Sequence, residues 1–205
     1  MKHDGTAELL AYWNRIRGKR PAPEQAEIEP GAIARQLPDI FILELPVDSD
    51  ARFRLAGTRL CTVYGGELKN ASFLSLWKAE DRTGIRQILQ MVFEDKRAAI
   101  IEQEGKSQSG RSAAFETLLL PLADSRLIGS MAAVDPAYWL GADRITENTA
   151  RAIDLIDPRR ELQVALKAAA GAGAPSVYLQ EPVHFTGPAV SRRFRHLTVL
   201  NGGKS

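Results

Sequence analysis

The fold of this chain is decided by the stretch FRLAGTRLCTVYGGELKNASFLSLW, residues 53–77. It opens with a short alternating run that is typical of a strand and that ends at Gly57. The remainder mixes glycine, small polar residues and aromatic residues, and it is too broken for one long helix. The stretch therefore predicts a strand followed by short helices. Their aromatic side chains either line a ligand pocket or simply fill a core.

The segment before this stretch predicts a strand that pairs with it. Residues 39–45, DIFILEL, are apolar on both faces, so both faces of the strand should be covered. A turn at residues 46–50 joins them to the second strand. The expected antiparallel register places opposite one another Leu45 and Phe53, Leu43 and Leu55, and Glu44 and Arg54. This agreement of apolar and charged pairs favours a β-hairpin.

One long helix and three strands follow. Residues 79–96 predict an amphipathic helix whose buried stripe consists of Ile85, Ile88, Leu89 and Val92. Tight turns separate three further predicted strands, at residues 98–103, 112–120 and 126–134. Sequential strands joined by such turns indicate an α+β fold, in which helices group on one face of an antiparallel sheet.

The first residues predict a further helix, Thr6 to Arg17. Its apolar stripe consists of Leu9, Leu10, Trp13 and Ile16. This stripe is more apolar than a free terminal helix should expose. We expect the helix to pack on the outer face of the sheet, and we expect the same surface to contribute to a homodimer, with Trp13 near its interface.

The character of the sequence changes after residue 141. Residues 146–156 and 160–170 are interpreted as possible helices, and residues 171–175 as a linker. These boundaries predict an N-terminal helical segment (1–37), a central domain (38–141) and a C-terminal extension (142–205). The extension is expected to be partly helical, flexible and less ordered than the core.

Composition excludes several classes of protein. With 44 % hydrophobic and 25 % charged residues the chain reads as globular, and a net charge of +2 is too small to indicate nucleic-acid binding. Cys61 is the single cysteine, so no disulfide framework forms within the chain. The sequence shows neither a signal peptide nor a membrane-spanning segment. We expect a cytoplasmic protein without membrane insertion.

Side chains for catalysis or metal binding are sparse. The three histidines, His3, His184 and His196, lie in the terminal segments and have no ligand-like neighbours at helical spacing. Cys61 has no histidine near it in sequence and is better interpreted as a small buried apolar residue. The sequence therefore predicts no catalytic residue, no metal site and no enzyme.

Five segments together resemble a PAS domain, and more closely the small, often stand-alone PAS proteins of bacteria. They are LLAYWNRIRGKRPAP, IEPGAIARQLPDIFILEL, the stretch 53–77, LLLPL and PAYWLG. The resemblance covers roughly residues 8–141. It implies a five-stranded antiparallel sheet with short helices across one face, and an apolar pocket between the two layers.

The resemblance implies a candidate ligand pocket, although the same side chains can serve only as core. The residues are Leu55, Cys61, Tyr64, Phe73, Trp77, Ile85, Ile88, Leu89 and Val92. PAS domains that bind flavin covalently carry a cysteine within Asn-Cys-Arg, whereas Cys61 lies within Leu-Cys-Thr. PAS domains that bind haem carry a histidine on the long helix, and this chain has none there. No cofactor is expected.

Two functions follow from the resemblance. The first is a non-enzymatic signalling module that regulates partners such as histidine kinases or other regulators, with roles in motility or cell-cycle control. The second is a sensor whose pocket holds an unidentified small molecule and whose occupied state biases a dimer interface or the C-terminal segment. Fold alone does not choose between them.

Overall fold

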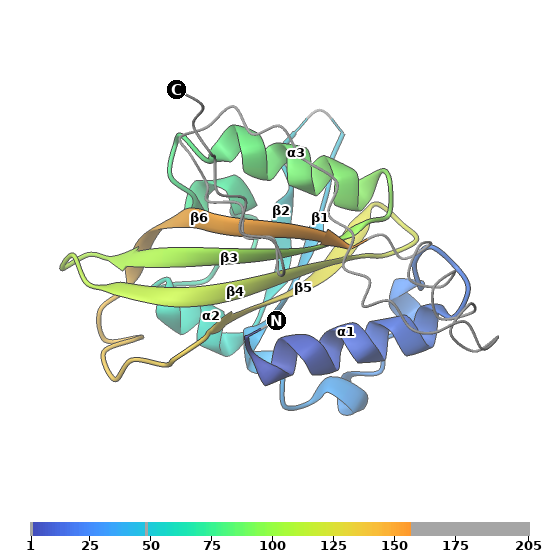
Figure 1. The fold of residues 1–205 in the computed structure, drawn as a ribbon, viewed down its shortest axis with the longest axis horizontal. Coiled ribbons are helices and arrows are strands. Elements are labelled where there is room, and N and C mark those ends of the chain that lie inside the picture. The colour runs from blue at the N-terminus through green and yellow to red at the C-terminus, as the bar shows by residue number, and fades with distance from the viewer. Residues whose placement is uncertain (1, 48, 157–205) are drawn as a thin grey trace, which may run out of the picture.

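The computed structural model describes residues 2–47 and 49–156, and within them six strands form one antiparallel sheet (Figure 1). The strands are β1 (Ile40–Glu44), β2 (Arg52–Ala56), β3 (Ala98–Ser107), β4 (Ser112–Pro121), β5 (Arg126–Ala133) and β6 (Ile145–Ile156). Their order across the sheet is β2-β1-β5-β4-β3-β6. The predicted α+β class, the β1–β2 hairpin and the β3–β4–β5 meander are confirmed.

Helices cover both faces of this sheet. The helices are α1 (Asp4–Arg17), α2 (Thr58–Val63) and α3 (Arg82–Phe93), with short 3₁₀ turns η1 (Gln25–Glu27), η2 (Pro30–Ile33), η3 (Leu37–Asp39) and η4 (Phe73–Leu76). The long helix α3 lies on the inner face through its predicted stripe, and α1 lies on the outer face, as expected (Figure 1). None of the helices in the described residues has the length and apolar character that a membrane crossing requires.

The hairpin forms with a register that differs from the predicted one. Leu43 lies opposite Phe53, not Leu55, and Leu55 lies opposite Ile42. An irregularity between Ile42 and Leu43 shifts the pairing, and such a bulge cannot be read from alternation alone. Arg54 still reaches Glu44, at 3.6 Å between the guanidinium and the carboxylate.

The sheet has six strands where five were expected, and the sixth corrects the helix predicted at residues 146–156. β6 pairs antiparallel with β3 along its whole length. Without it, ten residues of β3 would present an open edge, and β-branched residues such as Thr146, Thr149 and Ile153 suit a strand. The sheet thus continues past residue 141, while the division into three segments remains a prediction. The helix at 160–170, the linker and the flexibility expected beyond residue 156 lie outside the described residues.

Gly57 allows the chain to pass from β2 into α2 for a steric reason. Its backbone dihedrals, φ −67° and ψ 158°, are open to any residue. A Cβ atom at this position would, however, lie 2.3 Å from the carbonyl oxygens of Leu37 and Pro38. Its N–H also donates to the carbonyl of Ile40 at 2.7 Å. Close approach of η3, rather than an unusual turn, requires glycine here.

Candidate functional site

Six of the nine predicted pocket residues meet in one buried cluster between the inner face and the helices. They are Phe73, Trp77, Ile85, Ile88, Leu89 and Val92. Tyr64 packs against the edge of this cluster, and Cys61 is only half-buried. Leu55 points away from it, because its side chain lies on the edge strand β2 and is 48 % exposed.

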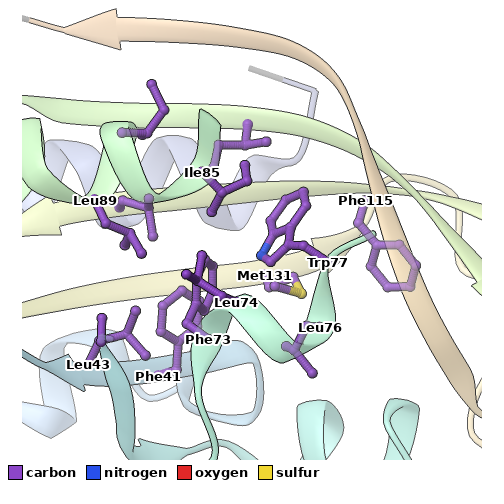
Figure 2. Packing of buried hydrophobic residues seen from close by; sticks show 14 of the residues in the cluster. Phe41, Leu43, Phe73, Leu74, Leu76, Trp77, Ile85, Leu89, Phe115 and Met131 are labelled. Carbon is purple, nitrogen blue, oxygen red and sulfur yellow. The ribbon is translucent and has the colours of Figure 1, made fainter. Parts of the chain in front are cut away.

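Aromatic rings occupy the space between the sheet and the short helices (Figure 2). The centroid of Phe73 lies 5.7 Å from that of Phe41 and 5.9 Å from that of Trp77, and Phe41 in turn lies 5.6 Å from Phe53. These separations are those of aromatic rings in direct contact. The chain's own aromatic side chains thus occupy part of the layer in which a ligand pocket was expected.

One polar atom in this interior has no partner. The indole Nε1–H of Trp77 makes no hydrogen bond within the described residues, although the side chain is buried. Figure 2 shows the ring beside Met131 and Ile85. A buried donor without an acceptor costs about 1–3 kcal/mol. An acceptor from a bound molecule or a water would remove that cost.

A buried polar network adjoins the aromatic rings. The Tyr64 hydroxyl donates to the Met131 sulfur at 3.0 Å and accepts from the Asn148 amide at 2.8 Å. Gln103 extends the network, since its amide donates to Met131 at 3.5 Å and its oxygen accepts from Thr117 at 2.9 Å. Burial raises the pKa of the Tyr64 hydroxyl above its ordinary value.

The same network ties β6 to the connection between η4 and α3. The Asn148 amide donates to the Leu76 carbonyl at 2.9 Å, and the Lys78 N–H donates to the Asn148 carbonyl at 2.9 Å. In the same connection, just before α3, the buried Asp81 carboxylate accepts a hydrogen bond from the Ala150 N–H of β6 at 3.0 Å. Sequence reasoning missed Asn148 and Asp81, because their partners lie about 70 positions away along the chain.

A pocket of about 500 Å³ lies beside this polar network and shares Met131 with it. β1 begins at Ile40, opposite Ser130, so the last residues of β5 extend beyond it. The gap is bordered by α2, η3 and residues 136–140. Its lining comprises His3, Asp39, Arg59, Leu60, Thr62, Val63, Phe115, Met131, Ala132, Ala133, Pro136, Ala137 and Leu140. We call it the outer pocket. It includes none of the nine predicted residues.

One ion pair stands in the wall of the outer pocket. The guanidinium of Arg59, on α2, donates to the carboxylate of Asp39, on η3. Burial raises the pKa of Asp39 above its ordinary value, and Arg59 opposes that rise. No sequence pattern joined these two residues, which are 20 positions apart.

The predicted dimer residues lie against the chain's own sheet. Leu9, Leu10 and Trp13 are buried in the apolar cluster between α1 and the outer face of the sheet, and Ile16 packs partly buried at the border of this cluster. Ile40, Leu118 and Ile128 of the sheet face them. A homodimer stays a prediction, but these side chains reach a second copy only if α1 leaves the sheet.

Comparison with known proteins supplies the family. No curated protein matches the chain. The family model of the PAS domain matches residues 1–132, which takes in α1, both faces of the sheet and all the strands except β6 and the last residue of β5. This match spans well over half of the chain and agrees with the antiparallel sheet and its helices. The chain therefore belongs to the PAS domain family.

Proposed function

We propose that the chain is a non-catalytic cytoplasmic regulatory module that acts by direct contact with signalling proteins, such as histidine kinases or other regulators. PAS domains are in general signalling and sensory modules. The observation that carries the proposal is the packing of aromatic rings in the interior. Phe41, Phe73 and Trp77 occupy the layer in which a sensor would hold its ligand. Motility and cell-cycle control are the bacterial processes that we expect such contact to serve.

The edge strand β2 is the surface that we assign to partner contact. Leu55 exposes its apolar side chain there, although it had been expected inside a pocket. The backbone of β2 is already engaged at Phe53, whose N–H donates to the Ala71 carbonyl at 3.0 Å and whose carbonyl accepts from the Asn70 N–H at 2.7 Å. The Leu55 side chain is therefore the group that β2 offers to a partner. The affinity of a partner that contacts β2 would depend on the position of the β1–β2 hairpin, and no bound ligand would be needed.

The test begins with a photo-cross-linking amino acid at position 55, which identifies the partner in cells. The purified partner is then titrated with the purified chain, with no small molecule added. Leu55→Arg should weaken the complex at least about tenfold. Tyr138→Arg, at an exposed aromatic residue outside the strands, is the matched control and should leave affinity unchanged. Equal affinity for the wild type and Leu55→Arg would contradict the assignment.

The unpartnered indole of Trp77 favours a second candidate, a small-molecule sensor. Native mass spectrometry of the freshly purified chain separates the two candidates. The regulatory module should show the polypeptide mass alone. A retained molecule that persists in Ala137→Leu, a variant with the outer pocket partly filled, would place a ligand in the interior and support the sensor.

A further inference from the structure

The outer pocket has one buried charge and a wall that is otherwise mainly apolar. The Asp39 side chain is 7 % exposed, whereas the Arg59 side chain that pairs with it is 58 % exposed. The other polar side chains have partners of their own. The Thr62 hydroxyl donates to the Thr58 carbonyl at 2.9 Å, and the His3 Nδ1 accepts from the Gly5 N–H at 3.2 Å. Leu60, Val63, Phe115 and Met131 supply much of the remaining surface.

The two members of the ion pair differ in how easily each can lose its partner. Arg59 can turn into solvent at small cost, because most of its side chain is already hydrated. Asp39 cannot, because a buried carboxylate without a counter-charge is strongly unfavourable. A molecule that enters the pocket therefore has to leave a positive charge beside Asp39.

We propose that the outer pocket binds an organic cation with an apolar body, whose ammonium or guanidinium group replaces Arg59 at the Asp39 carboxylate. The volume of about 500 Å³ falls within the range of small-molecule sites, about 300–1,000 Å³. The apolar body would lie against Leu60, Phe115 and Met131. This site shares Met131 with the interior polar network but includes no residue of β2, so it goes beyond the partner contact proposed above.

The same geometry rejects anions. An anionic group would have to share the Arg59 guanidinium with Asp39, which would place two negative charges beside a single cation. Like-charge repulsion of this kind is a common means of excluding the wrong ligand. A neutral analogue avoids this repulsion but gains nothing from Asp39. The expected order of affinity is cation, then neutral, then anion.

The experiment uses the full chain and three probes with one apolar body: 4-phenylbutylamine, 4-phenylbutanol and 4-phenylbutanoate. Binding is followed by protein-observed NMR at neutral pH. Fragments of this size bind in the millimolar range, so titration extends to about 10 mM. The amine should bind at least about fivefold more tightly than the alcohol and should shift the resonances of Ala132, Ala133 and Leu140. Absence of amine binding, or equal binding of the acid, overturns the proposal.

Three variants test whether the Asp39 carboxylate is the group that binds the amine. Asp39→Asn should remove the preference for the amine and leave the alcohol unaffected. Arg59→Gln should strengthen amine binding severalfold, because it removes the competing cation. Arg86→Gln, in the exposed pair with Asp50, is the matched control and should change nothing. Should Asp39→Asn fail to fold, Ala137→Leu should weaken binding of all three probes. Unchanged amine binding in either Asp39→Asn or Ala137→Leu overturns the site.

Discussion

The indole Nε1 of Trp13 donates a hydrogen bond of 2.9 Å to the carbonyl oxygen of Pro121, the last residue of β4. The Arg17 guanidinium covers the other side of the ring, 4.9 Å from its centroid. Trp13 is 2 % exposed and thus fixes α1 to the outer face of its own sheet. The apolar stripe of α1 is therefore buried within one chain.

Trp13→Ala should lower the free energy of unfolding by about 3–5 kcal/mol, because it removes a buried aromatic ring and leaves a cavity. Urea denaturation followed by circular dichroism measures this. Tyr138→Ala, at an exposed aromatic residue, should stay within about 0.5 kcal/mol of the wild type. A loss below about 1 kcal/mol for Trp13→Ala would mean that α1 does not hold the outer face.

Leu89→Ala should cost about 2–5 kcal/mol, because Leu89 is buried between α3 and the sheet. Gln90→Ala, at the next position of the same helix, is exposed and should have little effect. Urea denaturation of the pair gives the difference directly. Similar midpoints for the two variants would show that another face of α3 meets the sheet.

Gly57→Ala should destabilise the chain by at least about 2 kcal/mol, since the added methyl group would overlap two backbone carbonyls that cannot move independently. Gly66→Ala is the matched control, because nothing lies within 4 Å of a Cβ atom there. Thermal unfolding of both variants measures the contrast. Equal melting temperatures would argue against the close approach of η3.

Asn148→Ala should cost about 1–3 kcal/mol and should loosen β6, since the Leu76 carbonyl and the Tyr64 hydroxyl both lose a donor. Hydrogen exchange should show faster exchange over residues 145–156 than over β4. Glu147→Ala, one position earlier, should leave the exchange of β6 close to that of the wild type. Unchanged protection of β6 in Asn148→Ala would show that pairing with β3 alone holds it.

The buried Asp39 carboxylate should lower the free energy of unfolding more at neutral pH than in acid. Burial raises its folded pKa above the unfolded value, so its favourable contribution is present below the unfolded pKa and is lost as pH rises through the folded pKa. The stability of the wild type relative to Asp39→Asn should therefore increase as pH falls from 7 to about 4. Arg59→Ala should enlarge this change, because it removes the group that lowers the pKa. Denaturant titrations over that range test it, and a wild type that loses stability relative to Asp39→Asn as pH falls would contradict the burial of Asp39.

The sequence by itself determined the elements whose residues are close together along the chain. The spacing of Ile85, Ile88, Leu89 and Val92 predicted the buried face of α3, and the stripe through Trp13 predicted where α1 packs. The broken stretch at residues 53–77 predicted short helices in the right place. Local periodicity is sufficient for these features, because a helix or strand buries its own apolar face whatever its neighbours are.

The tertiary structure alone decided what depends on distant partners. The pairing of Leu43 with Phe53 depends on a bulge, and β6 is a strand because β3 offers it an edge. The hydrogen bond between Tyr64 and Asn148 joins residues 84 positions apart, and the Asp39–Arg59 pair arises only where η3 meets α2. The free energy of such contacts depends on which surfaces the whole chain brings together, and local patterns of residues do not record it.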